Sequence, residues 1–312
     1  MITTAVWLVV VFGAGASVAA LGLRAGFALP WIERLHPRTR ARWLAWSSLA
    51  PVAVGALLLF ATFVPHAWLG LPDQCSTHAG HLHLCLSCGL PTPPLALAIV
   101  ALGYAGWVAS RIGRVLAQLV QARRALRRLR ATEARDGELG ILPIDGPVAF
   151  VAGFLQPRVF LSSTARSRAW SAVVAHERDH ARHRDPLARL LARLASSVAP
   201  PGIGPWLEGR LVRAQELAAD EAAADEVGDR FEVARQVVAW ARQQRAVPPL
   251  ALSFGHGDVT ERVRVLIDAP RYLRGPSRAQ LGALVLASPL LVAVIAPSMH
   301  HVIDELVHFL DH

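Results

Sequence analysis

Apolar residues gather in four long runs separated by polar segments. The runs cover about Thr3 to Leu23, Leu44 to Phe63, Leu95 to about Trp107, and Leu281 to Ile295. A helix needs roughly twenty apolar residues to cross the hydrocarbon of a bilayer. The third run is therefore long enough only if its helix continues past Ser110. We interpret the pattern as a mainly α, polytopic membrane protein with four transmembrane helices.

The first run is typical of a membrane helix rather than a cleaved signal peptide. It has no positively charged segment before its apolar core, and no small-residue cleavage site precedes its basic flank. We expect residues 1–110 to form a three-helix transmembrane region with an external loop at 65–94. Residues 279–312 are expected to form the fourth transmembrane helix and a short external tail.

Basic residues are unevenly distributed, and their distribution predicts the orientation of the helices. The 32 residues counted as Lys+Arg are all arginine. Many lie between the first two runs or directly after the third, whereas the loop 65–94 and the tail after Pro297 contain none. Cytoplasmic loops of membrane proteins carry an excess of basic residues. Both termini are therefore expected outside and residues 111–278 in the cytoplasm, and the net charge of +9 follows from this topology.

The arginine-rich segment after the third run is predicted to continue it as an amphipathic stem. Leu116, Leu119, Val120 and Leu126 keep part of the helical spacing. Arginine clusters also occur in nucleic-acid-binding proteins. A position next to a membrane span instead favours contact with lipid headgroups or a simple topological charge bias, so we expect no direct nucleic acid binding.

Two short β-prone runs precede the centre of the cytoplasmic region, which we expect to be an α+β domain. Val148 to Ala152 and Arg158 to Leu161 are separated by Gly153 and Pro157, and they predict a small β-hairpin or edge strand. Such an edge can bind an extended peptide through main-chain hydrogen bonds. The two strands can equally serve only to cover the helix that follows.

The strongest chemical signal is the sequence His176-Glu177-Arg178-Asp179-His180. Residues four apart lie on one face of a helix, so both imidazoles can reach one metal ion with Glu177 beside them. Zinc in hydrolases usually takes three protein ligands and keeps a fourth position for water. We therefore interpret the two histidines as zinc ligands and Glu177 as the catalytic base. The alternative is a surface helix rich in solvated charge.

Glu216 is the predicted third ligand. It lies in Trp206 to Val227, a run rich in Ala, Leu, Glu and Arg that indicates a helix. The Pro- and Gly-rich segment 200–205 comes before this helix. It lets the helix fold back against the helix that carries His176 and His180, which we call the metal helix. Asp220 shares a helix face with Glu216. It is placed to hydrogen-bond a ligand histidine and fix the tautomer of that ring.

Other polar residues flank the motif. Arg178 and Asp179 are both charged, so they are expected to point away from the buried side of the metal helix. Asp185-Pro186 is typical of a helix start, and the metal helix should kink or restart there. We expect Asp185 and His183 to contact the ligand side chains rather than the metal ion. His183 is also a competing ligand candidate.

Two further helices are predicted downstream, at Phe231 to Gln244 and Val259 to Ile267, with a glycine-bracketed loop between them. His256 in the loop, and Arg262 and Arg264 in the second helix, are candidates for stabilising the oxyanion of a tetrahedral intermediate. For each residue taken singly, loop packing or a solvated helix face is the alternative.

The external loop carries a second group of residues with metal-binding chemistry. They are Cys75, His78, His81, His83, Cys85 and Cys88. Outside the cytoplasm two of the three cysteines can form a disulfide, which leaves one thiol over. The same spacing suits a soft metal such as zinc or copper. A disulfide with incidental histidines and an external metal site therefore both remain open.

This arrangement resembles the antirepressor membrane metallopeptidases of the BlaR/MecR type and, more distantly, the HtpX-type membrane proteases. The resemblance covers nearly the whole chain, and its specific parts are Ala149 to Ser162, His176 to Asp185 and Glu216 to Asp220. It implies Zn2+ held by the two motif histidines and the downstream glutamate, with the motif glutamate as catalytic base. It also implies a protein substrate, a cytosolic transcriptional repressor.

The chain departs from that family in two places. Only about fifteen residues follow Pro297, so the external penicillin-binding domain of the antibiotic-sensing members, and with it β-lactam sensing, is not expected. His183 stands where the family usually has Arg. Three other functions fit the sequence: a quality-control protease for membrane proteins, a catalytically silent membrane receptor, and a metal sensor that depends on the external loop.

The topology can be tested with reporter fusions. A reporter fused at Asp136 should be active only as a cytoplasmic marker, and one fused after His312 only as an external marker, because the arginines lie on one predicted side. Paired phosphatase and galactosidase fusions measure both positions. The reversed pattern would place the metal motif outside the cytoplasm and remove cytosolic proteins as substrates.

Overall fold

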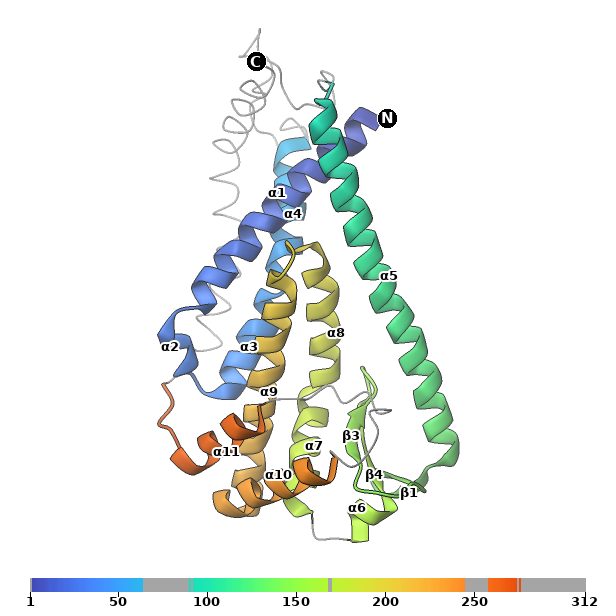
Figure 1. The fold of residues 1–312 in the computed structure, drawn as a ribbon, viewed down its shortest axis with the longest axis vertical. Helices are drawn as coiled ribbons and strands as arrows, with labels where there is room; N and C mark the ends of the chain where they lie inside the picture. Colours follow the sequence, from blue (N-terminus) through green and yellow to red (C-terminus); the bar gives the residue numbers. More distant parts are fainter. Residues whose placement is uncertain are drawn as a thin grey trace, which may run out of the picture.

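The helices near the N-terminus gather at one end of the protein with the start of a 38-residue helix, and a small sheet lies beside shorter helices at the other end (Figure 1). The computed structural model describes residues 2–63, 90, 92–167, 170–244, 258–273 and 275. The first helices are α1 (Ile2–Phe27), α2 (Pro30–Glu33), α3 (Pro37–Ser47), α4 (Ala50–Phe63) and α5 (Leu95–Thr132). The later ones are α6 (Ser163–Ser167), α7 (Ser171–His183), α8 (Asp185–Ala195), η3 (Ser196–Val198), α9 (Ile203–Val227), α10 (Arg230–Gln244) and α11 (Val259–Asp268).

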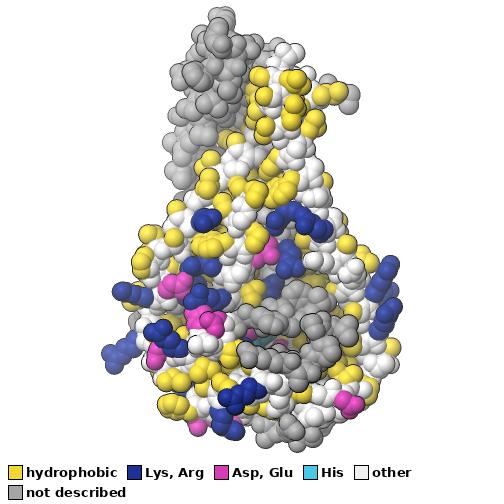
Figure 2. Space-filling model, in the orientation of Figure 1, with side chains coloured by type: hydrophobic (Ala, Val, Ile, Leu, Met, Phe, Trp, Pro, Cys, Tyr) yellow, Lys and Arg dark blue, Asp and Glu magenta, His cyan; other side chains and the backbone are white. Residues whose placement is uncertain are grey.

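Three helical segments in the described part of the chain are long and apolar enough to cross a membrane. They are Ile2–Phe27, Pro37–Phe63 and Leu95–Thr132, which confirms the first three predicted spans at this level. In Figure 2, apolar side chains dominate the surface where these segments gather, and most charged side chains lie toward the other end. The predicted fourth span, the tail, and residues 65–89 and 91 of the external loop lie outside the described residues.

α1 crosses α4 at a contact between glycines. A Cβ added to Gly15 would lie 3.2 Å from the Cα of Gly55, and one added to Gly55 would lie 2.9 Å from the backbone oxygen of Phe12. Small residues let membrane helices approach closely enough for backbone packing. Any larger side chain at Gly55 would therefore push the two helices apart.

α5 is one continuous helix of 38 residues, so the predicted continuation past Ser110 is confirmed. At 1.5 Å per residue it extends about 57 Å. Figure 1 shows it leading from the membrane end of the protein to the sheet, which begins two residues after the helix ends.

The sheet has four strands in the order β1-β2-β4-β3. They are β1 (Ala134–Asp136), β2 (Leu139–Leu142), β3 (Ala149–Ala152) and β4 (Arg158–Ser162). The predicted hairpin is confirmed as the antiparallel pair β3 and β4, while β2 pairs with β4 in parallel. This order leaves β3 at an edge of the sheet, where it contacts α7.

The metal helix breaks where the sequence predicts. α7 ends at His183, Arg184 takes a left-handed conformation with φ of 53°, and α8 starts at Asp185 with Pro186 in its first turn. Proline is favoured there because the first N–H groups of a helix have no partner within the helix. Beyond the break, α8 runs toward the end where the three candidate membrane segments gather (Figure 1).

α8, η3 and α9 form a helical hairpin whose tip reaches the membrane helices. No residue between Arg193 and Glu208 is charged. The tip contacts α1, α4 and α5. The Tyr104 hydroxyl on α5 donates a hydrogen bond to the backbone carbonyl of Val198, at 2.8 Å. The hairpin therefore connects the metal motif to the membrane helices directly.

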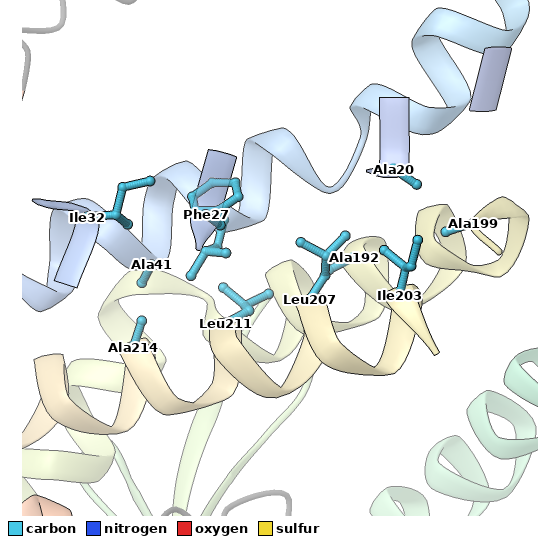
Figure 3. Packing of buried hydrophobic residues seen from close by; sticks show 11 residues of the cluster. Ala20, Phe27, Ile32, Ala41, Ala192, Ala199, Ile203, Leu207, Leu211 and Ala214 are labelled. Atoms are coloured by element: carbon cyan, nitrogen blue, oxygen red, sulfur yellow. The ribbon is translucent and has the colours of Figure 1, made fainter. Parts of the chain in front are cut away.

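One apolar core, which we name the shared core, joins this hairpin to the first membrane helices (Figure 3). Phe27, Ile32 and Ala41 approach it from α1, α2 and α3, and Leu207 and Leu211 approach it from α9. Each of these five side chains is 4 % exposed or less. Burial of apolar surface is the main favourable term in folding, so this core stabilises the packing of the hairpin against the first membrane helices.

α10 and α11 pack against a part of α9 that does not belong to the shared core. Both predicted helices are confirmed within about one residue at each end, as Arg230–Gln244 and Val259–Asp268. A second buried cluster packs them against α7 and α9 through Ala175, Ala223, Val233 and Leu266. α11 is thereby held with one face toward the metal motif.

Leu211→Ala tests the shared core. Leu211 is 1 % exposed, so its truncation leaves a cavity between α9 and the membrane helices. We expect the free energy of unfolding to fall by about 2–5 kcal/mol. Leu191→Ala is the matched control, because Leu191 is 45 % exposed and leaves no cavity. Thermal unfolding of the detergent-solubilised protein measures both, and equal melting temperatures would contradict the role of the shared core.

Candidate metal centre

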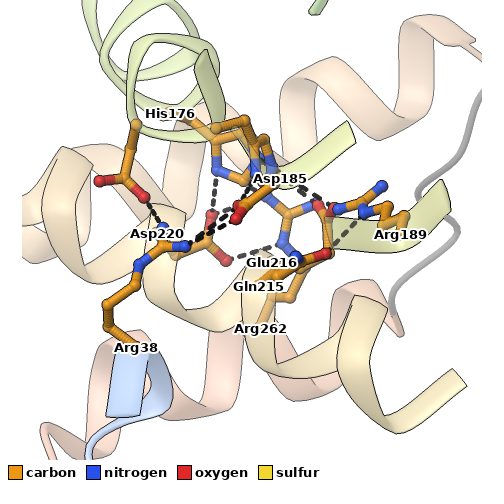
Figure 4. Close-up of polar contacts among 10 residues, drawn as sticks. Arg38, His176, Asp185, Arg189, Gln215, Glu216, Asp220 and Arg262 are labelled. Carbon is orange, nitrogen blue, oxygen red and sulfur yellow. Dashed lines mark hydrogen bonds and ion pairs between the residues drawn. The ribbon is translucent and has the colours of Figure 1, made fainter. Parts of the chain in front are cut away.

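The two motif histidines and Glu216 meet where α7 packs against α9 (Figure 4). His176 and His180 lie one turn apart on α7, and Glu216 lies on the facing side of α9. All three side chains are buried, at 8, 6 and 5 % exposure. Their potential ligand atoms lie within 4.8 Å of one another, so these residues form a group that can hold a metal ion.

The separations between ligand atoms fit a single small metal ion. The Nε2 atoms of His176 and His180 are 3.1 Å apart. The Glu216 carboxylate oxygens lie 3.4 Å from Nε2 of His176 and 3.5 Å from Nε2 of His180. Tetrahedral coordination with bonds near 2.05 Å places neighbouring ligand atoms about 3.3 Å apart. The three residues therefore need little adjustment to bind a common metal ion.

The other nitrogen of each ring is held by an aspartate. Nδ1 of His176 donates to Asp220 at 2.9 Å, and Nδ1 of His180 donates to Asp185 at 2.7 Å. A hydrogen on Nδ1 leaves the lone pair on Nε2, the atom that points to the other ligands. Two lone pairs and two carboxylate oxygens thus converge on one point, which favours a cation there.

The pKa values of the group also indicate that positive charge is stabilised at this point. Burial alone would lower the pKa of His180, but the charge of Glu216 and the hydrogen bond to Asp185 outweigh burial and raise that pKa to about 9. Burial would raise the pKa of Asp220, yet Arg262 and His176 lower it to about 2. The Glu216 carboxyl likewise has its pKa lowered, by His180 and His176 against the effect of burial. Protons and a metal ion compete for the same nitrogen atoms.

Two arginines neutralise part of this negative charge. Arg262 on α11 makes two hydrogen bonds to Asp220, at 2.6 and 2.7 Å, and lies 3.4 Å from Glu216. Arg189 on α8 donates to Glu216 at 2.9 Å and to Gln215 at 2.6 Å. The sequence prediction gave Arg262 a role at an oxyanion; in the structure its guanidinium holds Asp220, the partner of His176, and lies near the candidate ligand Glu216. Arg189 was not predicted, although its spacing from Asp185 on one helix face was a usable signal.

Asp179 does not point away from the buried side of α7, and that prediction is wrong. Its side chain is buried because Arg38 from α3 forms an ion pair with it, and Nδ1 of His183 lies 3.0 Å from its carboxylate. Arg178 is 44 % exposed, as expected, and pairs with Glu226. A charged residue within the motif is therefore tolerated because a cation from a distant helix reaches it.

The remaining predicted site residues fall into three groups. His183 is turned to Asp179 and is absent from the group of convergent ligand atoms; burial and Arg38 lower the pKa of His183 to about 4. The Arg264 side chain is 79 % exposed and pairs with Asp268, so it lies outside the metal centre. His256 and the Cys and His residues of the external loop lie outside the described residues.

Glu177 is half-buried beside His176, and its charge is among those that raise the pKa of Arg262. Five carboxylates and three guanidiniums gather at the centre: Glu177, Asp179, Asp185, Glu216, Asp220, Arg38, Arg189 and Arg262. At formal charges the excess is two negative charges. A divalent cation would balance it.

Glu216→Ala should lower the metal occupancy of the purified protein, because it removes one of the three ligands. Weakened binding of about 10–100-fold is expected for Asp220→Asn, which keeps the ligands but changes the partner of His176. Glu226→Gln, on the exposed part of α9, is the control. Metal content after dialysis, measured by mass spectrometry, compares the variants. Unchanged occupancy in Glu216→Ala would place the third ligand elsewhere.

Comparison with known proteins adds no relative to this picture. No protein-family model, no curated protein and no solved structure matches the chain. The ligands of the candidate metal centre are therefore assigned from the residues and geometry of this chain alone.

Proposed function

We propose that the protein is a membrane-embedded, zinc-dependent endopeptidase. The observation that carries the proposal is the convergence of His176, His180 and Glu216 on one point, with Glu177 beside them on α7. Two imidazoles and one carboxylate are the ligand set of zinc hydrolases that leave one position free. Asp220 holds His176 and Asp185 holds His180, and a hydrogen bond of this kind to the second ring nitrogen is what a metal-binding histidine needs.

Zinc at this centre would supply Lewis acidity toward a carbonyl oxygen and activation of water. We assign the proton transfers to Glu177, which is half-buried, whereas the three candidate ligands are buried. We propose that its carboxylate accepts a proton from the attacking water and passes that proton to the amine that leaves when the peptide C–N bond breaks. The proton count then balances without another acid.

Strand β3 offers a way to bind a peptide. It lies at the edge of the sheet, pairs with β4 on one side and contacts α7. An extended peptide that adds to the edge of β3, which pairs with no further strand among the described residues, would form main-chain hydrogen bonds and lie along the helix that carries the motif. This mode of binding depends little on side chains, so pockets around the centre would set the specificity.

We further propose that the domain faces the cytoplasm and that its substrate is a protein there, a transcriptional repressor if the family resemblance extends to function. The arginine distribution supports this side of the membrane. A quality-control protease would instead cleave many unfolded membrane proteins. A silent receptor would bind protein without cleavage, and a metal sensor would respond through the external loop.

Glu177→Gln tests the chemistry. The amide cannot accept a proton, so cleavage should fall by at least about 100-fold. Zinc content should stay unchanged because Glu177 is not a ligand. Cleavage of a cell-derived peptide library by the full-length protein in detergent, read by mass spectrometry, measures the loss. Glu226→Gln is the matched control, since it removes an exposed carboxylate from α9.

Two outcomes would contradict the proposal. Cleavage that persists in Glu177→Gln at the wild-type rate would remove Glu177 as the base. A wild-type protein that binds zinc but cleaves no member of the library at any position would favour the receptor.

A further inference from the structure

Arg38 reaches the metal centre from the membrane helices. It lies in the first turn of α3, and its side chain is only 11 % exposed. Its Nη1 atom donates to both carboxylate oxygens of Asp185, at 3.0 and 3.1 Å, and its Nη2 atom pairs with Asp179. Asp185 in turn accepts the Nδ1 hydrogen of His180 at 2.7 Å. Arg38 is therefore linked to a metal ligand through a single carboxylate (Figure 4).

The same order of groups occurs behind the other ligand histidine. There the carboxylate is Asp220, and the guanidinium that holds it belongs to Arg262. The two arrangements differ in the origin of the arginine. Arg262 comes from α11, close to the motif in the fold, whereas Arg38 comes from Pro37–Phe63, a segment long and apolar enough to cross a membrane.

We propose that Arg38 is a positioning residue of the metal centre, which fixes the orientation and ligand strength of His180 through Asp185. The inference rests on the metal binding that the proposed function requires. Without the guanidinium, Asp185 would lose the two hydrogen bonds that fix the plane of its carboxylate. Asp185 and Asp179 would also be left as buried charges without their shared cation, which is strongly unfavourable.

The consequence is that metal retention depends on a membrane helix. The shared core sets the position of α3 against α9, and α9 carries Glu216. Hydrogen bonds from N–H to oxygen normally span about 2.7–3.2 Å between donor and acceptor. A displacement of α3 by about one ångström relative to α9 would therefore weaken the contact of Arg38 with Asp185, and His180 would bind the metal less tightly.

The test compares zinc affinity in Arg38→Gln and Arg42→Gln. Both variants remove one charge from α3, but Arg42 is exposed. The full-length protein in detergent is titrated with zinc against a chromogenic chelator. We expect Arg38→Gln to weaken zinc binding by about 10–100-fold and Arg42→Gln to change it by less than about twofold. The visible spectrum of bound Co2+ should change only in Arg38→Gln, because the ligand geometry changes there.

Asp185→Asn separates positioning from a general loss of stability. If Arg38 acts through Asp185, adding Arg38→Gln to Asp185→Asn should weaken zinc binding no further. Losses that multiply in the double variant would overturn the proposal, as would wild-type affinity in Arg38→Gln. If Arg38→Gln does not fold, the zinc affinity of Arg38→Lys tests the proposal instead. Lysine keeps a cation for Asp179 but cannot hold both carboxylates as a planar guanidinium does, so wild-type affinity in this variant would also overturn the proposal.

The wild-type protein keeps this test separate from the test of the proposed function. If the wild-type protein binds no zinc, the proposed metal centre fails. If the wild-type protein and Arg38→Gln bind zinc equally, only the role of Arg38 fails.

Discussion

Burying a carboxylate costs several kcal/mol unless positive charge compensates it, and this protein buries four around one point: Asp179, Asp185, Glu216 and Asp220. The compensation comes from three arginines on three helices, Arg38 on α3, Arg189 on α8 and Arg262 on α11. Each of these helices must therefore stand where its guanidinium can reach the cluster. The mutual arrangement of α3, α8 and α11 around α7 and α9 satisfies this requirement. When the half-buried Glu177 is counted as well, the cluster keeps an excess of two negative charges, which a divalent ion would balance.

The centre also lies close to a segment that is long and apolar enough to cross a membrane. Arg38 contacts Asp185, and the apolar part of the same helical segment begins at Leu44, six residues or about 9 Å further along. On the proposed topology, a substrate must approach the inner surface of the membrane to reach Glu177. A segment next to a membrane anchor meets this condition directly, and a soluble protein meets it only after it has come to the surface.

Local patterns predicted the parts of the structure that depend on neighbouring residues. The spacing of His176 and His180, the helix that carries Glu216, the break at Asp185 and the hairpin of β3 and β4 follow from periodicity and from Pro and Gly positions. β1 and β2 have only three and four residues, too few to show a period. The sequence could not predict that Arg38 lies next to Asp185, which is 147 positions away, because nothing local to α3 distinguishes Arg38 from the other arginines. Asp179 was misjudged for the same reason.

The uncharged tip of the α8–α9 hairpin decides whether the metal-binding half of the chain can exist alone. A truncated protein that begins after the membrane helices would lose α1, α4 and most of α5, which contact the tip, and would expose the apolar segment 194–207 to water. Exposed apolar patches of this kind promote aggregation. Such a fragment would also lack Arg38, the cation shared by two buried aspartates. Aggregation of such a fragment would reflect an incomplete fold, so we expect a soluble form of the candidate metal centre to need the helices that cover the tip.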